Sequence, residues 1–343
     1  MKTDSFYYEL PDSLIAQHPA AERAHSRMMV INRSEGTVTC RHFYDIVEYF
    51  GNDDTLVIND SRVIPARLTG TKETGASIEI LLLTKLETPE TWEVLLKPAK
   101  RVRPGTRINF EGGPWAEVRD RVSEKKWTVA FQGVTDFPHF IERHGRTPLP
   151  PYIRRRKGES LFEGGDRERY QTVYAQRPGS VAAPTAGLHF TEDLLAALRD
   201  GGTGIVPVTL HVGYGTFLPI TSERIEEHRM EREYFELSEE AARRISDAHR
   251  LTAAGTTSTR VIETCAGGNG RLRASRGYTD LFIYPGYRFK RVDRLLTNFH
   301  LPRSSLFLLV CAFAGTELIR KAYTIAVEER FRFYSYGDCM LII

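Results

Sequence analysis

The stretch NDSRVIPARL at residues 59–68 marks the point where one sequence pattern ends and another begins. Apolar runs typical of strands lie before it, at 28–32 and 55–58, and Pro65 interrupts the pattern within it. A proline combined with a change of periodicity is typical of a boundary between structural elements. We therefore expect a domain boundary near residue 65.

The sequence after this boundary has a mostly β pattern. Turn signals such as RPG at 103–105 separate short runs that we expect to be strands, at 77–83, 91–96, 107–110, 116–121 and 127–131. Five or six strands at this spacing predict a small antiparallel barrel.

From PLPPY at 148–152 onward the pattern becomes mixed. We expect helices at 191–200, 238–253 and 317–329, alternating with strands at 205–210, 279–284 and 295–298. Such alternation is typical of an α/β domain. The predicted fold is α/β, with a mixed-sheet main domain formed by residues 1–65 and 149–343 and a small antiparallel β-barrel inserted at 66–148.

Composition and charge limit the kind of partner and the cellular location that we expect for the protein. Its 343 residues carry a net charge of only +3, yet basic side chains cluster, as at 154–157, and clusters favour a polyanionic partner. The four cysteines are far apart, and the longest apolar run, 306–314, is too short to cross a bilayer. We interpret this run as a buried helix and the acid-rich stretch 223–240 as a solvated face. A cytoplasmic monomer without membrane contact is expected.

The segment SVAAPTAGLHF at 180–190 comes just before a clear helix start. Thr191 is a suitable N-cap, leucines at helical spacing follow it, and Gly201 can end the helix. His189 therefore lies near free backbone N–H groups, where an anion or a reacting group could bind.

Four polar segments each follow an apolar run typical of a strand, namely PTAGLH at 184–189, TLHVGYGTF at 209–217, GTTSTR at 255–260 and TNFHLP at 297–302. Ligands collect at the carboxyl ends of strands in α/β sheets, so these segments could converge on one site. A single histidine in such a loop is more often structural. Three in similar settings, His189, His211 and His300, favour at least one with a function.

The GTTSTR segment offers hydroxyl groups and one guanidinium, which suit a carboxylate, a phosphate or a ribose. The alternative is a polar turn that caps the helix containing Val261. The sequence contains no GxGxxG, no GxxxxGK[ST] and no HExxH motif, so we predict no metal and no conventional Rossmann cofactor.

Aromatic side chains are dense in the C-terminal half, where they include Tyr284 and Tyr336. Alternating aromatics usually belong to a strand core, and the functional alternative is a surface that stacks a base or faces a cation. Asp338 follows in an aromatic setting that could raise its pKa, although surface exposure is equally compatible with the sequence. The basic run at 154–157 is either a solvated loop or a phosphate contact.

These segments together resemble one family, the S-adenosylmethionine:tRNA ribosyltransferase-isomerases of queuosine biosynthesis. The resemblance covers nearly the whole chain, from FYYELPDSLIAQ at 6–17 and NDSRVIPARL at 59–68 to TNFHLP at 297–302 and YSYGDCMLII at 334–343. It implies an α/β domain with an inserted β-barrel, which agrees with the pattern above.

The resemblance also implies a reaction. The ribosyl part of S-adenosylmethionine is transferred to 7-aminomethyl-7-deazaguanine at the wobble position of tRNA and rearranged to an epoxycyclopentanediol, while adenine and methionine leave. S-adenosylmethionine is a substrate, and no prosthetic group is implied. The partner is a tRNA anticodon stem-loop that carries the deazaguanine precursor.

We assign hypothetical roles on this basis. Proton transfer is given to His189 and His211, with His300 in reserve, and Asp338 is expected to contact the substrate amine or adenine. The residues expected to bind S-adenosylmethionine are Thr185, Gly187, Thr256, Thr257, Ser258, Arg260, Tyr284 and Tyr336. The residues expected to contact tRNA phosphates are Arg62, Arg154, Arg155 and Arg156. The rival interpretations are a methyltransferase-like α/β enzyme that uses the same cofactor and a non-catalytic RNA-binding protein.

Overall fold

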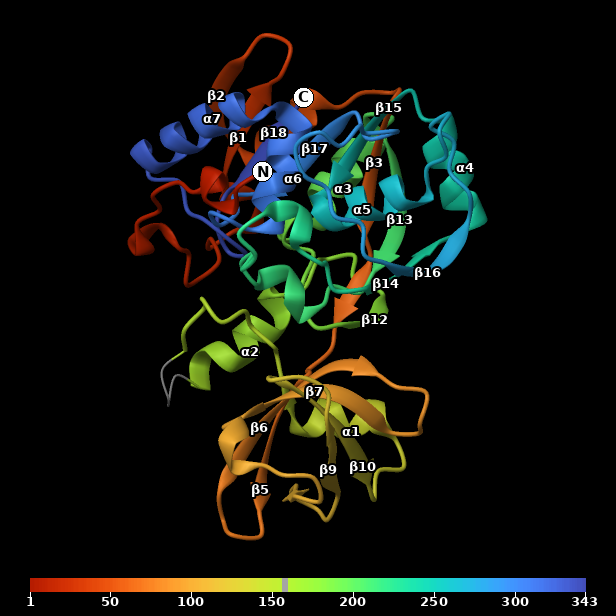
Figure 1. The fold of residues 1–343 in the computed structure, drawn as a ribbon. Coiled ribbons are helices and arrows are strands. Elements are labelled where there is room, and N and C mark those ends of the chain that lie inside the picture. Colours follow the sequence, from red (N-terminus) through yellow and green to blue (C-terminus); the bar gives the residue numbers. More distant parts are fainter. Residues whose placement is uncertain (156–159) are drawn as a thin grey trace. The chain divides into compact units, whose positions relative to one another are not determined.

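The computed structural model describes residues 1–155 and 160–343, and the chain divides into two compact units (Figure 1). The main unit contains Met1–Arg62, Pro150–Arg155 and Arg169–Ile343, and the described part of the second unit contains Val63–Leu149 and 160–168. The chain therefore leaves the main unit and later returns to it. The predicted fold class, α/β with an inserted antiparallel barrel, is confirmed.

A nine-stranded mixed sheet forms the centre of the main unit. In spatial order its strands are β16 (Ser275–Thr279), β14 (Glu233–Leu237), β13 (Gly204–Leu210), β3 (Asp54–Asn59), β15 (Arg250–Ala254), β17 (Arg294–Asn298), β18 (Cys339–Ile342), β1 (Arg27–Asn32) and β2 (Thr37–His42). The four strands β13, β3, β15 and β17 are parallel neighbours. A separate two-stranded pair joins β4 (Ser61–Val63) to β12 (Arg177–Ser180).

The sheet is covered on both faces because its strands are apolar on both sides. In β1, Met28 and Val30 belong to one core, whereas Met29 and Ile31 belong to the other. The first core includes residues of α3 (Glu192–Asp200) and the 3-10 segment η4 (Phe43–Tyr49). The second core includes residues of four helices, α4 (Glu239–Asp247), α5 (Gly255–Cys265), α6 (Ser305–Ala314) and α7 (Thr316–Glu328).

Two helices form as the sequence predicts. The Thr191 side chain accepts a hydrogen bond from the Leu194 amide at 3.2 Å, and Gly201 is the C-cap that follows the last residue of α3. The apolar run at 306–314 is the buried helix α6, which Ser304 caps by accepting from the Phe307 amide at 3.1 Å.

Three sequence expectations are wrong. The helix expected at 238–253 ends at Asp247 and is followed by β15, whose short buried run of small and apolar residues cannot be told from a helix by periodicity. The strand expected at 279–284 lies instead at Ser275–Thr279, because β16 is an edge strand with mostly exposed side chains and no apolar signal. The GTTSTR segment is not a loop after a strand, since it forms the first turns of α5.

The second unit is a closed six-stranded antiparallel barrel. Its strands follow the order β5 (Arg67–Lys72), β6 (Ser77–Lys85), β7 (Thr91–Lys97), β10 (Lys126–Gln132), β9 (Trp115–Arg121) and β8 (Arg107–Asn109), and pairing of β5 with β8 closes it. Alternate residues such as Ile78, Ile80 and Leu82 fill its interior. Phe137 and Phe140 of α1 (Phe137–His144) pack on Phe131, with ring centroids 5.1 and 5.8 Å apart. The unit also contains β11 (Gly145–Arg146), and α2 spans Ser160–Arg169.

Candidate functional site

The sheet topology brings several polar segments to one edge. The parallel strands β13, β3, β15 and β17 end there, and β18 starts there because it runs antiparallel to β17. β1 is parallel to β18, so its first residues lie at the same edge. Ser26, Asn298 and Asp338 are thereby brought together from three distant parts of the chain, as expected of a site at the carboxyl ends of parallel strands.

His189 lies at the end of the 3-10 segment η6 (Thr185–His189), which contacts β17 and α5. Its side chain is buried, and Nδ1 lies 2.7 Å from the hydroxyl oxygen of Ser26. Burial lowers the pKa of His189 to about 3, with Asn298 acting in the opposite direction and the nearby Arg332 and Arg23 adding to the decrease. The imidazole is therefore neutral at physiological pH.

Asn298 faces His189 from the end of β17. Its side-chain amide nitrogen donates to the carbonyl oxygen of Tyr334 at 3.0 Å, which leaves Oδ1 as the atom available to the histidine. Oδ1 of Asn298 and Nε2 of His189 are both buried, and within the described residues neither makes a hydrogen bond of ordinary geometry. Buried polar atoms without partners are rare and point to a function or to a missing ligand.

Two adjoining hollows lie on either side of this pair. His189 and Tyr336 line the first, which we call the His189 hollow, and His300, Thr185 and Asn298 line the second, which we call the His300 hollow. Ser335 lines both. The two hollows thus bring together four of the residues predicted from sequence, with Thr185 and His189 from η6, His300 from the segment after β17 and Tyr336 from the segment before β18.

His300 is held on several sides. Nε2 of His300 lies 2.9 Å from the Thr297 hydroxyl. The backbone amide of His300 donates to the Tyr323 hydroxyl at 3.0 Å, and its carbonyl accepts from the Tyr8 hydroxyl. Burial lowers the pKa of His300 to about 3. These contacts fix both the ring and the backbone of the segment after β17.

His211 has a different environment from the other two histidines. Its ring stacks on Tyr234 at a centroid distance of 5.7 Å, and a Cβ at Gly179 would lie 2.8 Å from its Nε2. Burial lowers the pKa of His211, while Glu236 acts against that decrease. His211 does not line either of the two hollows.

The hydroxyl-rich start of α5 is buried beneath η6. Ser258 donates to the Ala254 carbonyl at 2.8 Å, and Thr256 and Thr257 are nearly inaccessible, with Oγ1 of Thr257 lacking a hydrogen bond among the described residues. Arg260 pairs with Glu233 and also donates to the Leu281 carbonyl at 3.1 Å. The guanidinium predicted to bind a ligand is therefore engaged with the protein itself.

The interpretation of 223–240 as a solvated face is wrong at Glu233, which is only 4% exposed.

Two further residues predicted to bind S-adenosylmethionine have structural surroundings. Tyr284 lies outside both hollows and packs against Phe282, with ring centroids 5.0 Å apart. Gly187 is buried in η6, where a Cβ would lie 2.1 Å from the Tyr174 hydroxyl.

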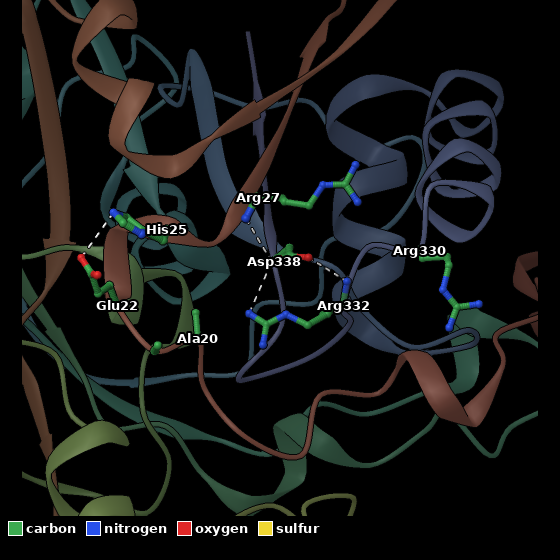
Figure 2. A pocket seen from close by; sticks show the side chains of 8 residues that line it. Ala20, Glu22, His25, Arg27, Arg330, Arg332 and Asp338 are labelled. Carbon is green, nitrogen blue, oxygen red and sulfur yellow. Dashed lines mark hydrogen bonds and ion pairs between the residues drawn. The ribbon is translucent and has the colours of Figure 1, made fainter.

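Asp338 is buried where β18 begins, and Figure 2 shows it between Arg27 and Arg332. Its carboxylate accepts from the Arg27 amide at 3.1 Å and from the Arg332 amide at 2.8 Å, and the Arg332 guanidinium lies 3.5 Å away. The carboxylate therefore holds the chain segments around the site.

The residues predicted to contact tRNA lie in two places. Arg62 is exposed on β4, whereas the Arg154 amide donates to the Gln17 side chain at 2.9 Å and the Arg155 guanidinium donates to the Gln17 carbonyl at 2.8 Å. Arg156 lies outside the described residues. Among the residues that are described, no group of three acidic, histidine or cysteine side chains could hold a metal ion, and no helix there is long and apolar enough to span a membrane.

Sequence reasoning missed Ser26, Asn298 and Arg23. Arg23 donates to the Leu188 carbonyl at 3.0 Å and lines the His189 hollow. The functional context of Ser26 and Arg23 depends on partners far away in the chain, and no local motif surrounds either residue. Only Asn298 carried a signal, because it lies in the TNFHLP segment, which begins in the last residues of β17.

Comparison with known proteins gives full-length matches. The family model described as queuosine biosynthesis protein matches residues 3–342. The chain is 54% identical over 362 residues to a Syntrophus aciditrophicus protein named S-adenosylmethionine:tRNA ribosyltransferase-isomerase, with all of both chains covered. Proteins of that name from Acetivibrio thermocellus and Geobacter metallireducens are each 49% identical, again across 100% of both chains.

A solved structure is also similar. The crystal structure of an S-adenosylmethionine tRNA ribosyltransferase from Thermotoga maritima has 36% sequence identity and a TM-score of 0.54, and the match covers 98% of this chain and 99% of that chain. An α/β sheet with buried polar and titratable side chains at the carboxyl ends of its parallel strands is the arrangement of an enzyme. The chain belongs to the queuosine biosynthesis protein family, as the sequence resemblance predicts.

Proposed function

We propose that this chain is a tRNA-modifying ribosyltransferase-isomerase that moves the ribosyl part of S-adenosylmethionine onto 7-aminomethyl-7-deazaguanine at the tRNA wobble position. Adenine and methionine leave, and the product carries the epoxycyclopentanediol of epoxyqueuosine. The observation that carries this proposal is the buried, neutral His189, whose Nε2 has no ordinary hydrogen bond within the described residues and whose ring lines a hollow. Relatives matched over their whole length bear the corresponding name.

The chemistry requires a base that tolerates a nearby cation. The sulfonium of S-adenosylmethionine acidifies the adjacent 5′ C–H bond and stabilises the ylide formed when that proton is removed. In our proposal Nε2 of His189 takes the proton, because Nδ1 is already engaged with Ser26. Burial lowers the pKa of His189, which makes the neutral ring a weaker base than an ordinary histidine but makes the imidazolium that forms a stronger acid, able to pass its proton to the departing adenine.

We place S-adenosylmethionine across the His189 and His300 hollows, whose free volumes of about 20 and 30 Å³ must enlarge to admit it. Tyr336 lines the first of them and Tyr152 and Tyr334 line the second, and aromatic faces stabilise a cation such as the sulfonium. Thr185 offers a hydroxyl to the same ligand. S-adenosylmethionine is consumed as a substrate, and the proposal includes no prosthetic group.

We propose supporting roles for the other residues singled out from sequence. His300, Gly187 and Asp338 position the segments around the two hollows, and Thr256, Thr257, Ser258 and Arg260 hold the start of α5 beneath η6. His211 and Tyr284 are given no direct contact with the substrate, since neither lines these hollows.

The tRNA anticodon stem-loop is the proposed macromolecular substrate. Arg154 and Arg155 are hydrogen-bonded to Gln17, which is close in sequence to Pro19 and Ala20 of the His189 hollow. Arg62 adds an exposed cation on β4. We propose that these arginines contact backbone phosphates, and that the modified base leaves the stacked loop to enter the hollow. A monomer in the cytoplasm completes the proposal.

One incubation separates the proposal from its rivals. The protein is mixed with labelled S-adenosylmethionine and tRNA that carries the deazaguanine precursor, and the small products are identified. Release of adenine and methionine supports the ribosyltransferase. S-adenosylhomocysteine would instead indicate a methyltransferase, and unchanged S-adenosylmethionine with bound tRNA would indicate a binding protein. His189→Ala, checked for an intact fold, should lose turnover, and activity equal to the wild type would remove His189 as the base.

A further inference from the structure

A third hollow, which we call the arginine groove, lies next to the His189 hollow. Arg27, Arg330 and Arg332 line it, and it shares Ala20 and Arg332 with the His189 hollow (Figure 2). None of the roles proposed above uses the guanidiniums of this groove to bind a ligand.

Neutral groups hold two of these guanidiniums in place, and each guanidinium also lies near one carboxylate, Arg27 at 3.7 Å from Glu329 and Arg332 at 3.5 Å from Asp338. Arg27 donates to the Glu329 carbonyl at 2.6 Å and lies over the Phe331 ring, 3.8 Å from its centroid. Arg332 donates to the His18 carbonyl at 3.3 Å. Such anchoring fixes the position of a cation and leaves its remaining N–H groups for a ligand.

Arg330 is exposed and makes no hydrogen bond or ion pair through its side chain within the described part of the chain. Its backbone has a φ of 54°, so Arg330 lies in the left-handed region, in a tight turn between Glu329 and Phe331. An unpaired arginine at the rim of a basic groove is well placed to meet an anion.

The acidic side chains nearby are already engaged. Asp338 is buried and held by Arg332 and two backbone amides, and Glu22 lies 3.3 Å from His25. Glu329 lies 3.7 Å from Arg27 with a side chain that is 60% exposed, so it is mostly solvated. Together the groove and the His189 hollow are lined by five arginines and two carboxylates, which leaves a net charge of +3.

The orientation of the guanidiniums distinguishes between two kinds of anion. In Figure 2 the guanidinium groups of Arg27, Arg330 and Arg332 point in different directions instead of converging on one point. A single carboxylate, such as that of methionine, is best bound by converging donors. Separate cations along a groove match an anion that repeats along a chain, as the phosphates of RNA do.

We propose that the arginine groove binds consecutive backbone phosphates of the RNA substrate, next to the nucleotide whose base enters the His189 hollow. This inference rests on the proposed function, since it takes RNA as the substrate. The groove then fixes the register of the RNA, because phosphate contacts position a nucleic acid while the pocket reads the base.

Arg330→Ala is the main test, because the side chain is exposed and unpaired and alanine accepts the same backbone conformation as poorly as arginine does. The dissociation constant of an anticodon stem-loop is measured at several salt concentrations, and that of S-adenosylmethionine is measured separately. Arg330→Lys keeps the charge. Arg243→Ala, which removes an exposed arginine of α4, is the matched control.

We expect Arg330→Ala to reduce the salt dependence by about one phosphate contact and to weaken RNA binding about five- to eightfold at about 0.1 M salt. Arg330→Lys should restore much of the affinity, and Arg243→Ala should behave as the wild type. An unchanged salt dependence would overturn the proposal. Loss of S-adenosylmethionine affinity with normal RNA binding would also overturn it, in favour of a carboxylate site.

The failure of the proposed function would look different. If the wild type released no adenine and methionine, that function would fall, whereas the RNA measurements would still decide whether the groove binds phosphates. If the wild type turned over and Arg330→Ala bound RNA normally, only the groove would be rejected.

Discussion

The carboxylate of Glu233 and the guanidinium of Arg260 form an ion pair in which both side chains are only 3% exposed. The other carboxylate oxygen of Glu233 accepts from the Gly213 amide and the Thr216 hydroxyl, each at 2.8 Å. The pair therefore connects α5 to the segment that follows β13, so two of the polar segments recognised from sequence are joined through a residue of β14.

Glu233→Gln should lower the free energy of unfolding by about 3–5 kcal/mol, because it leaves the Arg260 charge buried without its counter-ion. Chemical denaturation measures the loss. The double variant Glu233→Gln, Arg260→Met should recover much of it, since glutamine still accepts from Gly213 and Thr216. Glu240→Gln breaks the exposed pair with Arg244 and should cost less than about 1 kcal/mol. Equal effects of the two glutamine substitutions would contradict a buried charged pair.

The stability of the fold should depend on pH through His189 and His300. Burial lowers the pKa of each to about 3, whereas the pKa of an unfolded histidine is about 6.5. Between these values the unfolded chain binds more protons than the folded chain. The free energy of unfolding should therefore fall as the pH drops below about 6.5, by up to about 1.4 kcal/mol per pH unit for each histidine, and neither should contribute above about pH 7.

Denaturation at neutral and mildly acidic pH tests this dependence. His300→Gln should reduce the slope of stability against pH by about one proton, whatever its effect on stability at neutral pH. His139→Gln replaces an exposed histidine of the barrel unit and serves as the control. A slope in His300→Gln identical to that of the wild type would show that His300 is not buried in its neutral form.

The parts of the structure that sequence predicts are those fixed by local interactions. The Thr191 cap, the barrel strands and α6 depend on residues close together in the chain, so their patterns are visible in sequence. The contact between Ser26 and His189 joins residues 163 positions apart in the chain, and no sequence motif predicts it. The sequence predicts a ligand contact for Arg260 because the GTTSTR segment combines hydroxyl groups with a guanidinium, and it does not reveal the ion pair because Glu233 lies in an acid-rich stretch that resembles a solvated surface.

Asn298 and Ser26 should act as positioning residues for His189. Asn298→Asp places a carboxylate near the imidazole, which raises the pKa of a histidine. The acidic limb of the pH profile of kcat should therefore move to higher pH by about one unit or more, in a direction that a merely structural defect does not produce. An unshifted acidic limb would separate Asn298 from the titration of His189.

Ser26→Ala removes the hydroxyl that contacts Nδ1 of His189 at 2.7 Å. We expect kcat to fall about tenfold or more, since the orientation of the imidazole is lost, with a much smaller change in the KM for S-adenosylmethionine. Ser26→Thr keeps the hydroxyl and should retain most of the activity. If the alanine and threonine variants lose activity equally, packing and not the hydrogen bond is what Ser26 provides.

Gly187 tests how closely η6 is packed behind His189. A Cβ at this position would lie 2.1 Å from the Tyr174 hydroxyl and 2.7 Å from Cγ2 of Thr172, and both distances are shorter than any stable contact. Gly187→Ala must therefore displace η6 or its neighbours, at a cost of about 1–3 kcal/mol in the free energy of unfolding, and turnover should fall because His189 lies two residues away. Gly51→Ala is the matched control, because no atom lies within 4 Å of its Cβ position. Wild-type stability and turnover in Gly187→Ala would mean that η6 moves freely, and His189 could not then be held in one orientation by its surroundings.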